Sequence, residues 1–423
     1  MELGLKIHDM GYKIAIIADN HFVYSDDGKV YVNGTYTQQY LARFTSNFDS
    51  IVVIARGRKT YGIDEIKKLR ESGGDRVSFC FLDDFQGITG FLKSRNSIRE
   101  QLYKQLEFVD AIIVRMPCVL TTISLTCAKN RNIPILIDVG ADPETIYEGA
   151  ANKIVTFALS KYLKFICKKS CMNANGVSYV TKQILQSKYP CMAIKNGETK
   201  EYFTASISNV DISQDFYHKR VIDSNSELIK LVHVSNNIPS NSSKGHQEAI
   251  NILSSLIKKG YNAKLTFLGD GDGIVELKQQ AKQQGVIDTV EFKGRVADRN
   301  TYRSILLEND IFVFPSHSEG LPRVLLEAMA TGMVCVSSNV DGIPEILESN
   351  DIFDYSNIEG MTNRIIELVN NPEEMQRISS RNYQIAENYS IDKLRIIIDN
   401  YYSKVRQLID DKRKQFSNEK TES

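Results

Sequence analysis

The stretch from Phe314 to Gly332 reads FPSHSEGLPRVLLEAMATG, and it holds a strand end, a turn and a helix start in immediate succession. The apolar run Ile311–Phe314 is typical of a buried strand, and apolar residues at helical spacing begin near Leu321. Pro322 suits the first helical position, where its missing N–H would be unpaired anyway. A buried strand that turns directly into a helix predicts a parallel α/β sheet, with this turn at its carboxyl edge.

The start of this helix is a candidate anion site. Its first backbone N–H groups have no partner within the helix, and the helix dipole adds partial positive charge beside them. A phosphate or pyrophosphate group is the ligand that such a start favours at the carboxyl edge of a parallel sheet. The turn therefore predicts an anion pocket before any family is considered.

Two glutamates flank the turn. Glu319 lies within it, where a carboxylate can accept hydrogen bonds from substrate hydroxyl groups. Glu327 lies among Leu325, Leu326 and Ala328, and because burying an unpaired carboxylate is costly we expect it to have dedicated donors. A ribose diol would supply two of them. The alternative, a solvated loop acid and an exposed helix position, fits the turn and the small-residue end of the helix less well.

Strand and helix patterns alternate along the chain. Apolar, β-branched runs of the first half are Ile14–Ala18, Ser50–Ala55, Ser78–Phe81, Ala111–Val114, Pro134–Asp138 and Val177–Thr181. Those of the second half are Leu228–Val234, Ala263–Leu268, Val290–Phe292, Ile311–Phe314 and Val334–Ser338. Near-continuous apolar strands separated by helices are typical of parallel sheets covered on both faces. The predicted fold is α/β, with two Rossmann-like, doubly wound domains.

The same patterns predict where the domains begin and end. We expect a first domain at residues 1–205, a second at 206–385, and a last helix with a tail at 386–423. The polar segment Asn196–Ser226 lacks sustained periodicity, as a linker does. The last helix is expected at Ile391–Asp411, followed by Lys412–Ser423 as a frayed, charged tail with too few apolar residues to pack.

The composition excludes several classes of protein. At 423 residues the chain is too long for a minimal binding module. With 42% hydrophobic and 25% charged residues, it has the composition of a globular protein and not of a disordered one. Equal numbers of basic and acidic residues, 52 of each, give no overall attraction to nucleic acid, so none is expected as a partner. The seven cysteines form no CxxC pair, which favours reduced thiols in the cytoplasm. No apolar run is long enough for a signal peptide core or a membrane span.

The segment Glu319–Glu327 resembles the E-x7-E signature of retaining glycosyltransferases of family four. Further motifs of that family are matched in the same order by Lys244-Gly-His246, Leu268-Gly-Asp-Gly271, Glu291-Phe-Lys-Gly-Arg295 and Asp341-Gly-Ile-Pro-Glu345. Several motifs in the right order are far more specific than one alone. The resemblance covers most of the second half, and it is looser in the first.

The resemblance implies the GT-B architecture. In that family a nucleotide sugar binds the second domain, the acceptor binds mainly the first, and the reaction takes place in the cleft between them. The last helix crosses back to the first domain, and the domains close over the donor. No DxD pair of this chain stands in a convincing metal-binding context, so we expect neither a metal ion nor another cofactor.

The resemblance also assigns roles to individual residues. Glu327 would hold the ribose, Glu319 the transferred sugar, and the backbone of Gly320 and Leu321 the pyrophosphate. Lys244 would neutralise the charge that develops on the leaving diphosphate. The glycine turn that contains Gly269 would border the donor, and the nucleobase would be recognised through backbone near Lys293–Val296.

One position departs from the family pattern. Asn236 stands where the family often has an arginine, and a neutral amide can hydrogen-bond a phosphate but cannot offset its charge. Either Lys244 suffices, with help from Arg295 or Arg299, or donor binding is weak.

The first half offers less specific candidates. Gly34, ahead of an expected helix at Thr37–Phe44, is either a glycine loop that approaches the phosphates or a surface turn. Asp138 and Asp142 follow a buried strand, so one of them is a candidate contact for the donor sugar at the reaction centre. The alternative for Asp142 is a helix N-cap ahead of Pro143.

A lysine-rich segment raises the question of a membrane. Residues 149–197 contain eight lysines and neither Asp nor Glu. Helical spacing within Lys153–Cys171 places Lys161, Lys164 and Lys168 on one face, opposite Val155, Ala158, Leu159, Tyr162 and Ile166. The face is either an ordinary solvated face of a packed helix or a patch that rests on anionic lipid and brings the cleft to a lipid-linked acceptor.

Taken together, these observations predict an enzyme. It would transfer a hexosyl or N-acetylhexosaminyl group from a UDP- or GDP-sugar to a hydroxyl group of a glycan or lipid-linked acceptor, with retention, in bacterial capsule or surface polysaccharide synthesis. It would act in the cytoplasm, at the inner face of the membrane where the lysine patch binds lipid. The alternatives are a catalytically silent partner of an active transferase, which Asn236 alone supports, and a nucleotide-sugar epimerase.

Overall fold

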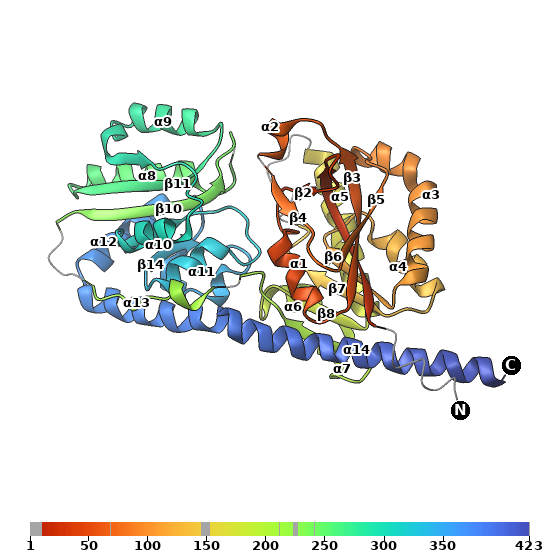
Figure 1. Ribbon diagram of the computed structural model, residues 1–423. Coiled ribbons are helices and arrows are strands. Elements are labelled where there is room, and N and C mark those ends of the chain that lie inside the picture. The colour runs from red at the N-terminus through yellow and green to blue at the C-terminus, as the bar shows by residue number, and fades with distance from the viewer. Residues whose placement is uncertain are drawn as a thin grey trace.

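The computed structural model describes residues 11–67, 69–144, 153–210, 212–222, 227–240 and 242–422 of the chain. Two α/β domains lie side by side, and two successive helices run along the same side of the molecule: α13 (Pro372–Ala386) along the second domain and α14 (Ile391–Glu422) along the first (Figure 1). No helix within the described ranges is both long enough and apolar enough to cross a membrane.

The first domain is built on a nine-stranded sheet in the described part of the chain. Its strands are β1 (Lys13–Tyr24), β2 (Val30–Val32), β3 (Ser50–Lys59), β4 (Arg70–Ser72), β5 (Val77–Leu82), β6 (Ala111–Met116), β7 (Ile135–Val139), β8 (Gly176–Tyr179) and β9 (Phe203–Ser206). The pairing is parallel except at β2, which runs antiparallel to β1 and β4. β9 pairs with β8 and so belongs to this sheet, although the sequence predicts a linker there.

Helices cover both faces of this sheet. One face packs against α3 (Gly87–Gln105), α4 (Thr121–Asn130) and α5 (Lys153–Asn173), and the other against α1 (Gln38–Thr45) and α14 (Ile391–Glu422). Short helices α2 (Ile63–Ile66), α6 (Ile184–Lys188) and α7 (Met192–Asn196) complete the domain. Successive strand residues bury on opposite faces, Ile17 toward α3–α5 and Ile16 toward α1 and α14. The doubly wound arrangement predicted from the apolar strands is confirmed.

The second domain repeats the plan with a six-stranded parallel sheet. Its strands are β10 (Ile229–Asn237), β11 (Ala263–Asp270), β12 (Val290–Phe292), β13 (Ile311–Phe314), β14 (Val334–Ser338) and β15 (Ile352–Phe353). Helices α8 (His246–Lys258), α9 (Ile274–Gln283) and α12 (Ile358–Val369) pack on one face, and α10 (Arg299–Leu307) and α11 (Arg323–Ala330) on the other. α13 (Pro372–Ala386) contributes to the cores on both faces. The order β12-β11-β10-β13-β14-β15 reverses direction between β10 and β13, where open α/β sheets bind ligands.

The last helix is longer than the sequence predicts. α14 buries Tyr402 and Val405 against Phe44 and the first sheet, so the expected return of the chain to the first domain is confirmed. It then continues as a helix to Glu422, and the prediction of a frayed tail after Asp411 is wrong. Arg413 explains part of this extension, because its guanidinium pairs with Asp110 at 2.7 Å.

The buried face of α5 also differs from the prediction. Leu163, Cys167 and Cys171 pack into the core, whereas Tyr162 is 52% exposed. Ala158, also expected on the buried face, is exposed, and the side chain of Val155 lies outside the described residues. The small cysteines allow the helix to approach the core closely, and the aromatic side chains stay outside.

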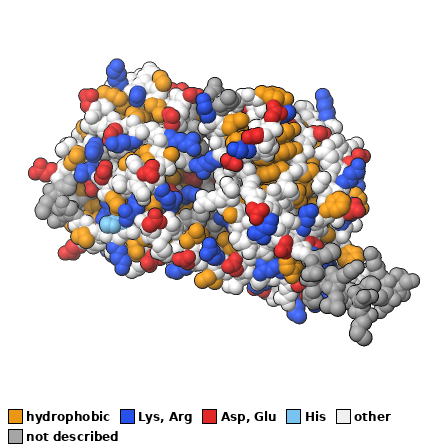
Figure 2. Space-filling view, in the orientation of Figure 1, with side chains coloured by type: hydrophobic (Ala, Val, Ile, Leu, Met, Phe, Trp, Pro, Cys, Tyr) orange, Lys and Arg blue, Asp and Glu red, His pale blue; other side chains and the backbone are white. Residues whose placement is uncertain are grey.

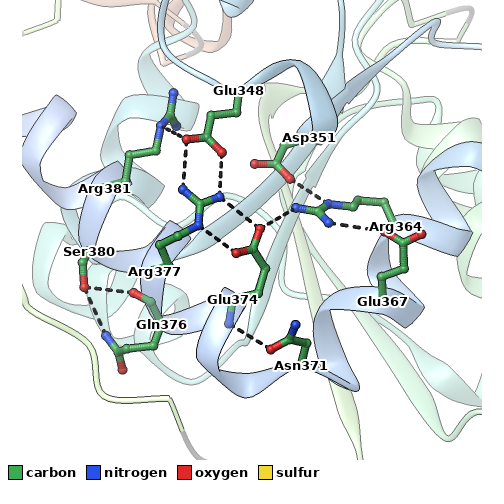
Figure 3. Close-up of polar contacts among 10 residues, drawn as sticks. All are labelled: Glu348, Asp351, Arg364, Glu367, Asn371, Glu374, Gln376, Arg377, Ser380 and Arg381. Atoms are coloured by element: carbon green, nitrogen blue, oxygen red, sulfur yellow. Dashed lines mark hydrogen bonds and ion pairs between the residues drawn. The ribbon is translucent and has the colours of Figure 1, made fainter.

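An ion-pair network joins α12 and α13 (Figure 3). Arg364 is central, because it donates to Asp351 at 2.9 Å and to Glu374 at 3.2 Å. Arg377 bridges Glu374 to Glu348. Since the Asp351 carboxylate is fully buried, this network holds α12 against the short turn that precedes β15.

Candidate functional site

A cavity of about 780 Å³ lies between the two domains. Loops at the carboxyl ends of β10, β11, β12 and β13 supply most of its lining, which is where the sequence predicts the donor site. Six of the predicted site residues line it, and so does the second predicted helper, Arg299: the six are Asn236, Lys244, Gly269, Arg295, Glu319 and Glu327. The first domain contributes Gln39 and Arg70, which the sequence did not single out.

Lys244 and Glu319 form an ion pair at the cavity wall. The Lys244 Nζ donates to Glu319 Oε1 at 2.6 Å and to the carbonyl of Ser318 at 3.2 Å. Ser316 Oγ donates to the same Glu319 oxygen at 2.9 Å. The carboxylate is 12% exposed and the lysine 37%, so the acid is held below the surface while the ammonium group faces the cavity's solvent.

A glycine next to Lys244 allows the Lys244–Glu319 ion pair to form. Gly245 has φ +77° and packs so closely on the end of β13 that an added Cβ would lie 2.1 Å from the carbonyl oxygen of Pro315. No other residue fits this conformation and this contact together. The Lys-Gly pattern therefore brings the loop after β10 into contact with the turn after β13.

The backbone of the turn is fixed by Asp341. Its carboxylate accepts the N–H of Glu319 at 2.8 Å, and Asp341 itself adopts the left-handed region with φ +45°. Burial raises the pKa of this carboxyl group. Asp341 belongs to a loop that the sequence resemblance includes, but its contact with the turn was not predicted.

The helix start differs by one residue from the prediction. Pro322 is the N-cap of α11, and the first helical residue is Arg323. Proline supplies no side-chain acceptor, and no side chain caps this helix start. Pro322 lines the cavity, so the positive end of the α11 dipole borders it. Gly320 and Leu321 are not among the lining residues; Gly320 lies against the backbone of Gly140 instead.

Glu327 is buried, as predicted, with an exposed fraction of 5%. Tyr302 donates its hydroxyl to Glu327 Oε2 at 2.9 Å, and Arg299 Nη1 lies 3.7 Å from Oε1. Burial beside this carboxylate raises the pKa of Tyr302 well above its usual range, so the tyrosine remains a hydrogen-bond donor. Glu327 therefore has a dedicated donor, as predicted. The donor is Tyr302 of the protein itself, which no sequence motif marked.

Gly269 and Asn236 face each other across two strand ends. Gly269 has φ +140°, and an added Cβ would lie 1.7 Å from the carbonyl oxygen of Ser235, so the turn requires glycine. Asn236 lines the cavity with an exposed side chain. Among the described residues, no three His, Cys, Asp or Glu side chains gather as a metal site would require.

Two candidates of the first domain do not line the cavity. Asp138 lies within β7, where Oδ2 accepts Arg115 at 2.6 Å and Oδ1 accepts Ser178 at 3.2 Å. Arg115 also donates to the Tyr40 hydroxyl at 2.8 Å. These contacts tie β6, β7, β8 and α1 together. Gly34 has φ +114° in the turn after β2 and is likewise absent from the lining.

Asp142 is 2% exposed and accepts hydrogen bonds from several donors in the described part of the chain. They include the Tyr189 hydroxyl at 2.5 Å, Lys188 Nζ at 2.6 Å and the backbone N–H of Glu144 at 2.9 Å. The last contact is an Asx turn across Pro143. A helix that would start next to it falls at residues 145–152, which lie outside the described residues.

Two buried histidines lie directly beneath the Lys244 loop. His233 on β10 and His246 at the start of α8 meet with ring centroids 4.7 Å apart. His233 Nδ1 contacts the carbonyl of Val313 at 2.8 Å, while both ring nitrogens of His246 have no hydrogen-bond partner within the described residues. Burial, together with the charge of Lys244, lowers the pKa of His233 to about 4. Burial, His233 and Lys244 together lower the pKa of His246 to about 2.

This pair predicts a loss of stability in mild acid. Both pKa values lie below the ordinary histidine value of 6.5, so the unfolded chain takes up protons that the folded chain cannot. The free energy of unfolding is unaffected by the protonation of these histidines above about pH 7. As the pH falls from 6.5 toward 4, each histidine lowers it by about 1.4 kcal/mol per pH unit. His246→Leu should remove about half of this dependence in urea denaturation at pH 7.5 and 5.5. Equal pH dependence in the variant and the wild type would contradict the prediction.

Comparisons with known proteins agree on the second domain. Residues 220–385 match the family described as glycosyl transferases group 1. Protein CapJ of Staphylococcus aureus is 26% identical over 372 residues, which are 87% of this chain and 90% of that protein. The N-acetyl-alpha-D-glucosaminyl L-malate synthase of Bacillus anthracis is 29% identical over 161 residues, which are 37% of this chain and 40% of the synthase.

The fold also matches solved structures. The HepE protein of Anabaena, in a crystal structure with UDP, superposes with a TM-score of 0.64 at 15% identity, and the match covers 93% of this chain and 99% of HepE. At that identity the likeness concerns the fold alone. The two Rossmann-like domains and the returning helix are thus a GT-B fold, as the sequence resemblance implied.

Proposed function

We propose that this chain, whose residues 220–385 match the group 1 glycosyl transferases, moves a sugar from a nucleoside diphosphate sugar to an acceptor hydroxyl group with retention at the anomeric carbon. The observation that carries the proposal is the placement of Lys244, Glu319 and Glu327 around one interdomain cavity at the start of α11. Lys244 and Glu319 come from loops after two different strands and Glu327 comes from α11, so their convergence is a product of the fold.

The chemistry requires charge stabilisation above all. The bond between the sugar C1 and the diphosphate oxygen breaks, the acceptor oxygen bonds to C1, and the hydroxyl proton leaves with the released nucleoside diphosphate. Negative charge grows on the departing diphosphate as C1 becomes cation-like, and preorganised cations and dipoles lower that barrier most. Lys244 supplies the cation, and the positive end of α11 supplies the dipole.

The two carboxylates would hold the sugars on either side of the diphosphate. Glu327 keeps Oε1 toward Arg299 at 3.7 Å, a distance long enough for a ribose hydroxyl to compete for that oxygen. Tyr302 meanwhile fixes Oε2. Glu319 shares one oxygen with Lys244 and Ser316, so we expect its other oxygen to accept a hydroxyl of the transferred sugar.

The relatives favour certain substrates. HepE is in complex with UDP in its crystal structure, and the Bacillus anthracis relative is an N-acetyl-alpha-D-glucosaminyl L-malate synthase. We therefore propose a UDP- or GDP-sugar as donor and a hexosyl or N-acetylhexosaminyl group as the transferred unit. For the acceptor we propose a glycan or lipid-linked hydroxyl group in bacterial surface polysaccharide synthesis, as the sequence resemblance implies.

Nucleotide binding tests the proposal directly. UDP, GDP and ADP should be compared by thermal denaturation, and the cognate nucleotide at a hundredfold excess over its Kd should stabilise the protein by about 2.7 kcal/mol. No shift with any of the three would contradict the proposal. Donor hydrolysis and transfer assays then separate a transferase from a silent partner, which binds without turnover, and from an epimerase, which converts the donor without an acceptor.

We also propose that turnover needs no divalent ion, because Lys244 and the α11 dipole supply positive charge at the diphosphate. Transfer measured in excess EDTA should equal transfer in Mg²⁺ within experimental error. A loss of activity with the chelator that Mg²⁺ or Mn²⁺ restores would overturn this part of the proposal.

The exposed face of α5 supports a contact with an anionic membrane. Phe157 is 64% exposed and Phe165 62%, and Tyr162 lies beside them. Lys168 and Lys169 are exposed on the same helix, whereas Lys161 and Lys164 already pair with Glu144. Interleaved aromatic and basic side chains suit the headgroup region of anionic lipid. The face thus differs in composition from the lysine stripe predicted from the sequence.

Flotation with liposomes tests the membrane contact. The wild type should float with vesicles that contain phosphatidylglycerol and not with phosphatidylcholine alone. Replacing Phe157 and Phe165 by serine should reduce the floated fraction several-fold, while Tyr61→Ser, at an aromatic side chain 77% exposed elsewhere in the domain, should not. Indifference of the wild type to lipid charge would exclude the contact.

A further inference from the structure

The charges that line the interdomain cavity do not balance. Five basic side chains line it, Arg70, Lys244, Arg295, Arg299 and Arg323, against the two acids Glu319 and Glu327. Lys and Arg side chains gather at the boundary between the domains on the face shown in Figure 2. An excess of positive charge converging on one cavity is unfavourable unless an anion occupies it.

The floor of the cavity offers little free charge to a diphosphate. Asn236, on the loop after β10, is neutral. The nearby Lys244 is already engaged by Glu319 at 2.6 Å. A doubly charged diphosphate bound there would therefore meet less positive charge than it carries, and the deficit must be made up by other side chains.

Arg70 is the cation that the opposite wall provides. It is the first residue of β4, and its backbone is fixed by pairing with Val32 of β2, so it moves with the first domain. Within the described residues it has no carboxylate partner, and neither has Arg295. Burial and the charges of Arg295 and Arg323 lower the pKa of Arg70, which places the three guanidinium groups within electrostatic range of one another.

We propose that Arg70 binds the diphosphate of the donor from across the cleft and supplies the charge that Asn236 does not. The proposal rests on the proposed function, because it assumes a nucleoside diphosphate in this cavity. A guanidinium group suits the task because its planar donors match phosphate oxygens in pairs. Arg295 and Arg323 face the same anion from the second domain.

Calorimetric titration of nucleotide and nucleoside separates this role from a structural one. UDP and uridine serve as probes, or GDP and guanosine if GDP gives the larger thermal shift. Arg70→Gln should weaken binding of the diphosphate about tenfold, reduce its dependence on salt, and leave binding of the nucleoside unchanged. The control is Arg58→Gln, which removes an exposed arginine of the same domain that pairs with Glu65 and lies outside the cavity.

Each of the other possible results would overturn the role proposed for Arg70. Equal weakening of diphosphate and nucleoside would assign Arg70 a structural role and overturn the proposal. Unchanged diphosphate binding with a raised KM for the acceptor would overturn it in favour of an anionic acceptor group. If the wild type binds none of the nucleoside diphosphates, the proposed function itself fails and the role of Arg70 falls with it.

Discussion

Lys244→Ala is expected to lower the transfer rate by about a thousandfold, the upper end of what the loss of one preorganised charge-stabilising donor costs. The Nζ group of Lys244 lies at the turn before α11, where its ion pair with Glu319 fixes it at 2.6 Å. The substitution removes the cation that meets the leaving diphosphate, and it also leaves Glu319 without its main partner. We expect kcat to fall more than donor affinity, since the charge on the diphosphate grows in the transition state.

A lysine elsewhere in the same domain provides the control. Lys259 pairs with Glu359 at 2.8 Å on the surface, so Lys259→Ala also removes the cation of a lysine–glutamate pair. It should leave turnover unchanged and stability within about 1 kcal/mol of the wild type. Transfer by Lys244→Ala within twofold of the wild type would refute the role assigned to this residue.

Arg364→Leu is expected to reduce the free energy of unfolding by about 3–5 kcal/mol, the cost of leaving a buried charge without its partner. The Asp351 carboxylate is fully buried and accepts Arg364 Nε at 2.9 Å (Figure 3). Burial raises the pKa of Asp351, and Arg364 opposes that rise. Without the guanidinium group the acid must ionise in an apolar setting or take up a proton, and both destabilise the fold.

Two further variants in urea denaturation isolate this effect. Arg377→Leu, at a side chain 49% exposed on the outer edge of the same network, should cost about 1 kcal/mol or less. The double variant Arg364→Leu with Asp351→Leu should recover most of the loss, because it removes both buried charges together. A loss below 1 kcal/mol in Arg364→Leu would show that the buried pair does not stabilise the second domain.

Much of the fold could be predicted because its strands are buried on both faces. Continuous apolar runs such as Val334–Ser338 can only be covered by helices on each side, and β14 has these same bounds. The edge of the first sheet could not be predicted in this way. β2 and β4 are three residues long, too short for a period to appear, and their pairing depends on contacts distant in sequence.

The loops of the site could be predicted where the backbone conformation allows only one type of residue. Gly245 and Gly269 occupy conformations and contacts that exclude other residues, so their motifs mark the loops that form the cavity. Side chains that reach the cavity without a special backbone conformation have no motif in the sequence that marks them. Tyr302 and Arg70 reach the cavity from a helix and an edge strand with no required spacing to the glutamates, and only the assembled fold brings them there.

Contacts between neighbouring strands also explain why Asp138, a candidate of the first domain, does not line the cavity. Asp138 follows the expected pattern of an acid near a strand end, but Arg115 lies on the neighbouring strand at the same register and pairs with it at 2.6 Å. Sequence patterns give the strand of each residue and not the order of strands in the sheet. The role of Asp138 at the reaction centre therefore remains a prediction, to be tested by the transfer rate of Asp138→Asn.

A crystal structure of the protein with its most stabilising nucleoside diphosphate tests the central claim most directly. We predict the diphosphate beside Lys244 at the start of α11, and the ribose hydroxyl groups within hydrogen-bond distance of the Glu327 carboxylate. A nucleotide bound elsewhere, or one whose ribose lies out of reach of Glu327, would contradict the account.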